Sequence, residues 1–305
     1  MKIIIVNKKS EFTSEQISTL EKLGEVIFIE TLEELQSTKE LSNSEEKVIA
    51  LDPGIANWTF TNETIDQINN LKAICLPTTK HGWVDGKHLR EKGVALTNVP
   101  KYSTESVAEH CILLMLSISK KLPLVINAGW KLDYAKHLGN EVSGSIMGII
   151  GFGDIGKRVS ELGKGMGMSV NYWSRNVKDS RFKYKELDEL IRTSDYVFLT
   201  LSESPETKDF FSKEKVDLMK KDSFLINISG DDVWDFEYLA QKVKSGDIAG
   251  IALDDDRRQA QDFGSNILIT PHIAWYTKEA SEEDFRIWVE SIRAFVEGTP
   301  INIVN

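Results

Sequence analysis

A glycine-rich turn is the part of this chain best placed to do chemistry. It follows the apolar run Ile146–Ile150, precedes the amphipathic segment Ile155–Met166, and contains Gly151, Gly153 and Gly156 in a G-x-G-x-x-G pattern. In this context the glycines permit a tight turn, close approach of a pyrophosphate, and close packing of helix on strand. Amides at the helix start, near Asp154 and Ile155, would meet the phosphate charge. The pattern predicts a dinucleotide-binding turn; the alternative is a glycine-rich turn without a ligand.

The strand after this turn bears on which dinucleotide would bind. An acidic residue at its end would accept a hydrogen bond from the adenosine ribose of NAD. No acidic residue lies between Glu161 and Asp179, and the run MSVNYW is followed by Ser174 and Arg175. A hydroxyl beside a guanidinium suits a 2′-phosphate, so the sequence favours NADP(H) and leaves NAD(H) open. The alternative is a surface arginine at a corner between strand and loop.

Apolar, β-branched runs alternate with helix-compatible stretches along the whole chain. An early set comprises KIIIV, GEVIFIE, KVIAL, LKAICL and VALTNV, and a later set SIMGIIG, MSVNYW, YVFLTL, SFLINIS, DIAGIALD and ILITPH. This alternation predicts an α/β fold with mostly parallel sheets. A long apolar helix is expected between the two sets, after Pro100. A length of 305 residues suits two domains, and the lack of a low-complexity linker predicts that they are closely joined.

Composition excludes several classes of function. The formal net charge of −10 argues against non-specific binding to nucleic acid or an anionic membrane. Cys75 and Cys111, the two cysteines, lie in apolar runs and are expected to be buried, reduced thiols. Nothing resembles a signal peptide, and no apolar run reaches bilayer-spanning length. These features predict a cytoplasmic protein.

Seven segments, in order along the chain, resemble the D-isomer-specific 2-hydroxyacid dehydrogenases, the family of phosphoglycerate dehydrogenase and hydroxypyruvate reductase. They are LPTTKHGWVD, VALTNVPKYSTESVAEH, MGIIGFGDIG, LSESPETK, INISGDDVWD, IAGIALDDD and TPHIAWYT. The resemblance implies two Rossmann-like domains with parallel sheets. Residues 1–99 plus 275–305 would form a discontinuous, flavodoxin-like substrate domain, and residues 100–274 the NAD(P)-binding domain. It also implies an active site between the domains, and a homodimer built partly by the helix after Pro100.

In this family an arginine binds the substrate's carboxylate and carbonyl, a histidine moves the hydroxyl proton, and a glutamate supports the histidine. The histidine corresponds to His272 in PHIAWYT; the alternative is a packed histidine after a proline. Gly230 occupies the arginine position, and Gln259, counted from Asp254, the glutamate position. The resemblance also assigns three residues to cofactor contact: Thr200, Ile228 and Asp254, the last at the nicotinamide end.

These two replacements change the expected chemistry. A guanidinium grips a carboxylate through two charge-assisted hydrogen bonds, and glycine offers none. Losing one positioned donor costs about 10²–10³ in kcat. Gln259 could orient His272, but a neutral amide stabilises an imidazolium weakly. The sequence therefore predicts weak or absent reduction of simple 2-oxo acids.

Nearby charged residues could replace the missing arginine or repel the substrate's carboxylate. In the expected substrate loop, Thr79-Lys80-His81, Lys80 replaces a glycine usual in the family, and Arg257 and Arg258 precede Gln259. Any of these cations could approach a carboxylate; the alternative is that they are solvated loop charges. Four carboxylates in the segments that contain Gly230 and Asp254 would repel an anionic substrate: Asp231, Asp232, Asp255 and Asp256. No metal site is expected in the run 254–256, because consecutive side chains point in different directions.

Three hypotheses follow for the function. The first is an NADP(H)-dependent oxidoreductase that acts on a neutral or unusual carbonyl or alcohol, with His272 as acid and base. The second is a catalytically impaired pseudoenzyme that binds the nucleotide and acts as a sensor or interaction protein. The third is an active D-2-hydroxyacid dehydrogenase with a relocated arginine. The expected partners are a small-molecule substrate or a nucleotide ligand.

Overall fold

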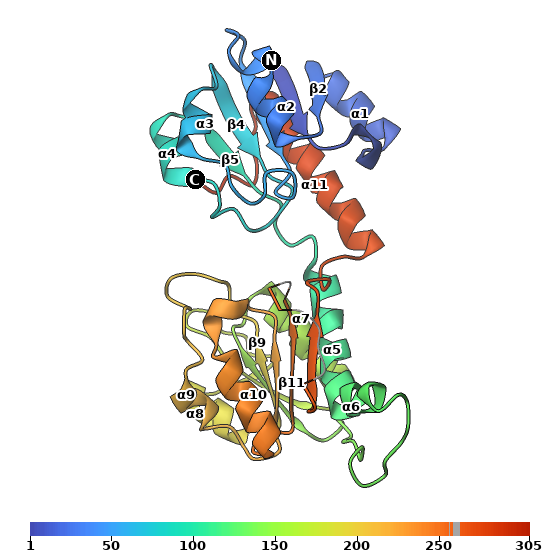
Figure 1. Cartoon of the computed structure of the whole chain (residues 1–305). Coiled ribbons are helices and arrows are strands. Elements are labelled where there is room, and N and C mark those ends of the chain that lie inside the picture. Colours follow the sequence, from blue (N-terminus) through green and yellow to red (C-terminus); the bar gives the residue numbers. More distant parts are fainter. Residues whose placement is uncertain (256, 259–262) are drawn as a thin grey trace. The chain divides into compact units, whose positions relative to one another are not determined.

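The computed structural model describes residues 1–255, 257–258 and 263–305. It divides into two compact units, Met1–Tyr102 with Lys278–Asn305, and Ser103–Thr277. Each unit is an α/β domain built on a parallel sheet, of five strands in the first and seven in the second (Figure 1). The sequence predicts the transitions between the domains at residues 99/100 and 274/275, whereas the compact units of the structure meet after Tyr102 and after Thr277.

The first unit has the strand order β2-β1-β3-β4-β5, the flavodoxin-like order. Its strands are β1 (Lys2–Val6), β2 (Glu25–Ile29), β3 (Lys47–Leu51), β4 (Leu71–Cys75) and β5 (Ala95–Thr97). Strands β1 and β3 are buried along their whole length. Continuous apolar runs of this kind are typical of parallel strands with both faces covered.

The helices of this unit lie between the strands, with one exception at the end of the chain. They are η1 (Lys9–Glu11), α1 (Ser14–Glu21), α2 (Leu32–Ser37), η2 (Lys39–Leu41), α3 (Asn62–Asp66), α4 (Gly86–Glu91) and α11 (Lys278–Val296). Each of α1 to α4 begins after a threonine or aspartate whose side chain accepts a backbone N–H of the first turn. These caps explain why the polar stretches between the strands form helices.

Helix α11 packs against the sheet of the first unit, although it lies far from those strands in sequence. Trp288 is fully buried, and its Nε1–H donates to the Cys75 carbonyl oxygen at 2.9 Å. In the tail that follows, the Val304 N–H donates to the Leu96 carbonyl oxygen at 2.9 Å. The two ends of the chain therefore form one domain.

The second unit has the strand order β12-β11-β10-β9-β6-β7-β8. Its strands are β6 (Ile146–Ile150), β7 (Ser169–Trp173), β8 (Lys183–Tyr184), β9 (Tyr196–Leu199), β10 (Phe224–Asn227), β11 (Gly250–Asp254) and β12 (Ile267–Thr270). The order reverses between β6 and β9, where doubly wound folds bind ligands. The register aligns Ile150 with both Trp173 and Leu199, so the residues that follow these three meet at one edge.

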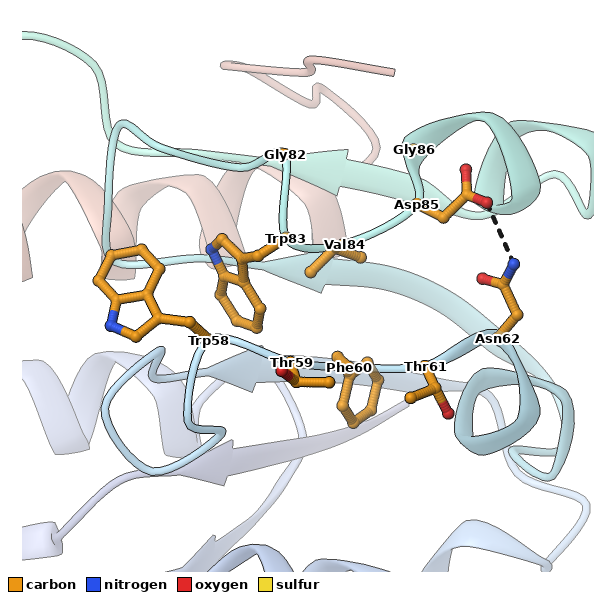
Figure 2. A pocket seen from close by; sticks show the side chains of 10 residues that line it. All are labelled: Trp58, Thr59, Phe60, Thr61, Asn62, Gly82, Trp83, Val84, Asp85 and Gly86. Atoms are coloured by element: carbon orange, nitrogen blue, oxygen red, sulfur yellow. Dashed lines mark hydrogen bonds between the residues drawn. The ribbon is translucent and has the colours of Figure 1, made fainter. Parts of the chain in front are cut away.

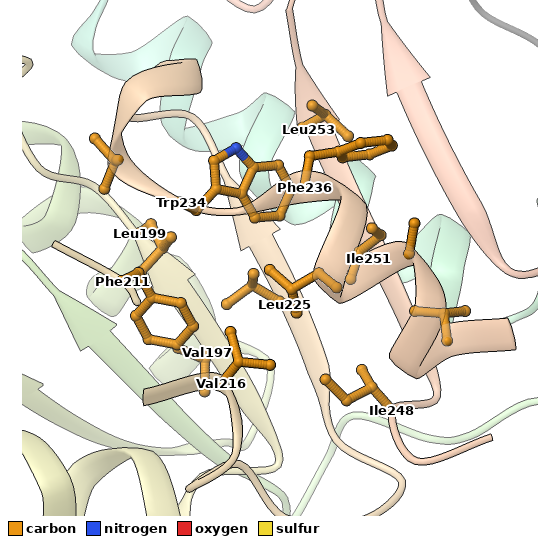
Figure 3. Packing of buried hydrophobic residues seen from close by; sticks show 14 of the residues in the cluster. Val197, Leu199, Phe211, Val216, Leu225, Trp234, Phe236, Ile248, Ile251 and Leu253 are labelled. Atoms are coloured by element: carbon orange, nitrogen blue, oxygen red, sulfur yellow. The ribbon is translucent and has the colours of Figure 1, made fainter. Parts of the chain in front are cut away.

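Helices cover this sheet and enclose two apolar clusters. They are α5 (Thr104–Ser119), α6 (Leu122–Asn127), α7 (Asp154–Gly165), α8 (Leu187–Thr193), α9 (Lys213–Val216), η3 (Asp231–Val233) and α10 (Phe236–Ser245). In one cluster Phe211, Trp234 and Phe236 pack with aliphatic residues of β9, β10 and β11 (Figure 3). The other joins α5 and α7 to the sheet and includes Cys111. The carboxyl edge of β6 and β9 to β12 thus rests on a packed apolar core.

Both cysteines are buried free thiols, as the apolar sequences around them predict. Burial raises the pKa of Cys75 to about 12 and that of Cys111 further. Among the described residues, no helix has the length and apolar character needed to cross a membrane.

Candidate functional site

The turn after β6 requires glycine at two positions. Gly151 has a φ of +99°, and a Cβ built on it would lie 2.6 Å from the Thr200 carbonyl oxygen. A Cβ on Gly156 would lie 2.2 Å from the Gly151 carbonyl oxygen. Backbone atoms cannot yield cheaply to such contacts, so a larger residue would push β6 and α7 apart. The two glycines permit the tight turn and the close packing of helix on strand.

Gly153 plays a different part. Its φ of −74° suits any residue, and nothing lies within 4 Å of the Cβ that it lacks. Helix α7, which opens with Asp154 and Ile155, starts after it without a side-chain cap. The first N–H groups of a helix have no partner inside the helix and attract anions. The open space over Gly153 and the uncapped helix start fit the pyrophosphate of a dinucleotide.

Thr200 and Ile228 follow the neighbouring strands β9 and β10. The Thr200 hydroxyl donates to the Gly151 carbonyl oxygen at 2.6 Å and so ties the turn to β9. Ile228 is half-buried and packs against the apolar cluster that contains Ile149. Both residues lie at the edge of the sheet beside the glycine turn. The Thr200 hydroxyl donates its hydrogen to the protein backbone rather than to a ligand.

Ser174 and Arg175 lie at the corner after β7. Ser174 is buried, and its Oγ accepts a hydrogen bond from the Val177 N–H at 3.2 Å. Arg175 is exposed. The Ser204 hydroxyl, and less strongly the charge of Arg175, lower the pKa of Glu206. The exposed guanidinium can meet a phosphate at this corner, in competition with the Glu206 carboxylate.

Asp254 ends β11 and organises the segment that carries His272. Its Oδ1 accepts hydrogen bonds from the Thr270 hydroxyl at 2.6 Å and the Ile273 N–H at 3.0 Å. Its Oδ2 accepts one from the Ala274 N–H at 2.9 Å. Asp254 therefore fixes the Thr270 side chain before His272 and the backbone of the two residues after it.

A buried histidine supports this arrangement. Nε2 of His110, on α5, lies 2.9 Å from Thr270 Oγ1 and 3.6 Å from Asp254 Oδ1. Because Thr270 gives its one hydroxyl hydrogen to Asp254, the His110 Nε2–H donates to Thr270. Burial lowers the pKa of His110, although the charge of Asp254 opposes this, so the ring is neutral at pH 7.

His272 itself is exposed and has a φ of +52°. Its N–H donates to the Thr270 carbonyl oxygen at 3.0 Å. A residue other than glycine pays about 1–2 kcal/mol for this conformation and keeps it only where its surroundings impose it. The hydrogen bonds of Asp254 to the next two residues impose it here. The imidazole is therefore presented to solvent beyond the end of β12.

The loop after β10 is built around Gly230. Its φ of +94° and ψ of 170° lie in a region that is essentially restricted to glycine. Asn227 ties the loop to the strand, because its Nδ2 donates to the Gly230 carbonyl oxygen and its Oδ1 accepts the Ser229 N–H. A Cβ on Gly230 would lie 3.5 Å from the Glu203 carboxyl carbon. Position 230 thus carries no guanidinium and faces a carboxylate.

Beyond Asp254, Asp255 holds two arginines. It is nearly buried and accepts hydrogen bonds from the Arg257 N–H at 2.9 Å and from the Arg258 guanidinium at 2.7 Å. Burial acts to raise the pKa of Asp255, but these hydrogen bonds and the charge of Arg257 lower it overall. Arg258 also lies over the Phe236 ring, 4.5 Å from its centroid. Arg258 is therefore fixed in place.

Arg257 extends to the neighbouring loop. One of its guanidinium nitrogens lies 3.7 Å from an Asp232 carboxylate oxygen, two residues along from Gly230. Asp256 and Gln259 lie outside the described residues, so the position of Gln259 beside His272 stays a prediction. Among the described residues, no group of histidine, cysteine, aspartate and glutamate side chains is arranged to hold a metal ion.

The expected substrate loop, Thr79–His81, belongs to the first unit and follows β4. The Thr79 hydroxyl donates to the Val99 carbonyl oxygen at 2.7 Å, and His81 Nδ1 lies 3.3 Å from the Thr79 carbonyl oxygen. Lys80 is exposed, and its carbonyl oxygen accepts the Trp83 Nε1–H at 3.1 Å. Hydrogen bonds within residues 79–83 and to Val99 thus restrain the loop.

Sequence patterns did not point to Glu203 or to the supports of His272. Ser106 and His110 lie four residues apart on the apolar helix α5; the Ser106 hydroxyl donates to the Ala274 carbonyl oxygen at 2.6 Å. Two polar positions on one face of an apolar helix were the available signal. For Glu203 the signal was an acidic residue after the strand next to β10.

Comparison with known proteins agrees with this geometry. Residues 112–274, more than half of the chain, match the family described as "D-isomer specific 2-hydroxyacid dehydrogenase, NAD binding domain". The chain is 28% identical over 310 residues to hydroxypyruvate reductase of Blautia hydrogenotrophica, covering 94% of each protein. It is 31% identical over 314 residues to glyoxylate reductase of Pyrococcus furiosus, covering 95% of this chain and 91% of that protein.

A solved structure has the same fold along the whole chain. It is an acyclic imino acid reductase in complex with NADPH and D-Arg, with a TM-score of 0.84 and 25% sequence identity. The match covers 100% of both chains.

Proposed function

Because this chain belongs to the D-isomer-specific 2-hydroxyacid dehydrogenase family, we propose that it is an oxidoreductase that moves hydride between a nicotinamide dinucleotide and a small hydroxy or oxo compound. The observation that carries the proposal is that the carboxyl edge of one sheet holds both the glycine turn and the strained, exposed His272. Ligands of doubly wound sheets bind along this edge.

The residues of the turn would hold the dinucleotide. The α7 start, with Gly153, Asp154 and Ile155, takes the pyrophosphate, and Ser174 with Arg175 takes the adenosine end. Arg175 favours NADP(H), and NAD(H) is the alternative. Ile228 and Asp254 would border the nicotinamide, which when bound supplies or accepts the hydride.

His272 would move the proton. In reduction its imidazolium donates to the carbonyl oxygen, and in oxidation its neutral imidazole takes the hydroxyl proton. Asp254 serves this step by fixing the backbone at Ile273 and Ala274. Orientation of this kind keeps the acid within reach of the reacting oxygen.

We propose further that simple 2-oxo acids are poor substrates and that a neutral or otherwise unusual carbonyl or alcohol is the natural one. Gly230 offers no donor, and Glu203 places a carboxylate beside it. Each loss of about 1.36 kcal/mol in transition-state stabilisation is tenfold in rate. Repulsion of the substrate's carboxylate adds to that loss.

One observation favours a second candidate, an active D-2-hydroxyacid dehydrogenase with a relocated arginine. The Arg257 guanidinium pairs with Asp255 and also approaches Asp232 on the loop of Gly230, whereas Arg258 pairs with Asp255 and lies over Phe236. If Arg257 binds the substrate's carboxylate, Arg257→Ala will abolish turnover of a 2-oxo acid, and Arg258→Ala will spare its KM. Equal activity of Arg257→Ala and the wild type removes this candidate.

The substitution His272→Asn tests the proposal. Asparagine tolerates positive φ, so the turn is kept while the acid is lost. We expect kcat to fall about 10²–10⁴-fold and the Kd for NADPH to stay unchanged. Unchanged kcat would place the acid elsewhere. Intact cofactor binding without turnover of any carbonyl by the wild type would instead indicate a pseudoenzyme acting as a sensor or interaction protein.

We also propose that the protein acts in the cytoplasm as a homodimer. Large apolar side chains are exposed on α5, α6 and the segment after them: Leu113, Ile126, Trp130, Leu132, Tyr134 and Leu138. Exposed apolar groups in one stretch of chain favour burial against a partner. A solution mass of one chain, 34.5 kDa, at micromolar concentration would overturn the dimer.

A further inference from the structure

A pocket lies in the unit that does not contain the glycine turn. It has a volume of about 560 Å³ and opens between residues 58–62 and 82–86. These two segments pair at the buried residues Phe60 and Val84. Trp58 and Trp83 lie at one end of the pocket, and Asn62 and Asp85 at the other (Figure 2).

The aromatic end presents indole rings at a cost in backbone energy. Trp58 is 48% exposed, and its ring centroid lies 5.9 Å from that of Trp83, at 72°. Asn57 and Trp58 have φ values of +48° and +53°. Each such residue costs about 1–2 kcal/mol, and strain of this kind collects at ligand sites. Burial of apolar surface does not account for a strained turn that exposes tryptophan.

The polar end offers acceptors. Asp85 accepts hydrogen bonds from the His88 N–H at 3.0 Å and from Asn62 Nδ2 at 3.1 Å. These two bonds, in that order, lower the pKa of Asp85, so its carboxylate is charged at neutral pH. Asn62 Oδ1 is shielded from water and has no hydrogen-bond partner among the described residues. None of the ten described residues that line the pocket is basic.

We propose that this pocket binds a small organic cation, a primary ammonium or guanidinium compound with an apolar body. Indole faces attract cations, and a carboxylate adds a charge-assisted hydrogen bond. Phe60 and Val84 line the pocket between its aromatic and polar ends, where the apolar body of the ligand would lie. The volume is that of a small-molecule site, which favours a free amine over a side chain of another protein. An anionic ligand would meet the negative charge of Asp85, with no basic residue among the described ones that line the pocket.

The pocket is connected to the expected substrate loop. The Nε1–H of Trp83 donates to the Lys80 carbonyl oxygen, so the ring that meets the ligand also restrains residue 80. The proposed binding site does not depend on the proposed oxidoreductase activity, because all the residues that line the pocket belong to the first unit.

Calorimetric titration of the full chain with phenethylammonium chloride tests the proposal, with 2-phenylethanol as the neutral probe at the same ionic strength. We expect the cation to bind at least fivefold more tightly than the alcohol. Asp85→Asn keeps the helix cap and removes the charge, and should weaken cation binding at least fivefold. Asp235→Asn, the same change at the helix cap of α10, is the matched control and should have no effect.

A second pair of variants tests the aromatic end. Trp58→Asn removes the indole and tolerates the positive φ, and should weaken cation binding at least fivefold. Trp130→Asn is its control, because Trp130 is also exposed and has a φ of +62°. Equal affinity for cation and alcohol, absence of saturable cation binding, or equal effects within either pair of variants would overturn the proposal.

Discussion

The Glu203 carboxyl carbon lies 3.5 Å from the point that a Cβ on Gly230 would occupy. The φ of +94° and ψ of 170° at Gly230 keep that residue a glycine, so restoring an arginine there would require a new loop backbone. Glu203 is therefore the charge that this position meets. A substrate without a carboxylate avoids the repulsion, and this relationship is the structural basis for the proposed preference.

A substitution at Gly153 should weaken cofactor binding without changing stability. Gly153→Ala adds a Cβ where the protein leaves open space, so the free energy of unfolding should change by less than about 0.5 kcal/mol. The same Cβ would intrude on the pyrophosphate and should raise the Kd for NADPH at least tenfold. Gly165→Ala, at an equally open position near the end of α7, is the control and should leave that Kd unchanged. Equal Kd values for NADPH in both variants would show that the turn does not contact the cofactor.

Arg175 should decide between the two dinucleotides. Arg175→Ala removes the cation for a 2′-phosphate and should weaken NADPH at least tenfold while NADH binding changes less than twofold. Arg192→Ala, an exposed arginine on α8, controls for the loss of a positive charge. Fluorescence titrations at fixed salt measure both constants. Parallel losses for NADPH and NADH would contradict a role in choosing the cofactor.

Asp284 should make stability fall as pH rises. Burial, with a smaller contribution from the charge of Asp52, raises the pKa of Asp284 to about 8, above its ordinary value of 3.8. The folded protein thus binds a proton that the unfolded chain releases, and the stability from this group is lost between about pH 4 and 8. The slope approaches at most about 1.4 kcal/mol per pH unit.

Asp284→Asn removes that proton and should flatten the pH dependence of urea unfolding between pH 5 and 8. Glu282→Gln changes an exposed carboxylate on the same helix and should leave the wild-type slope. A wild-type slope in Asp284→Asn would mean that Asp284 is ionised in the folded protein.

The fold could be predicted because its strands are local and continuous. KIIIV and SIMGIIG form β1 and β6, which have the burial of parallel strands covered on both faces. The glycine spacing also predicted the tight turn. The structure explains the spacing, because a Cβ at Gly151 or Gly156 would clash with backbone atoms. Short-range patterns of this kind need no knowledge of distant contacts.

The remaining features depend on residues far apart in sequence or on backbone angles. Asp52 and Asp284 come together only because α11 returns to the first sheet. The positive φ of His272 has no signature in residue type or spacing. Glu203 became relevant only when strand order placed the loops after β9 and β10 side by side.

The most direct test of the account compares matched substrates. Oxidation of NADPH and NADH should be followed with pyruvate and glyoxylate and with their neutral methyl esters, for the wild type, Glu203→Gln and the control Glu237→Gln. The account predicts a higher kcat/KM for the esters. It also predicts an ester-to-acid ratio about threefold lower in Glu203→Gln only, as expected for removal of one exposed charge. Wild-type reduction of the acids at least as fast as the esters, with a ratio unchanged in Glu203→Gln, would contradict it.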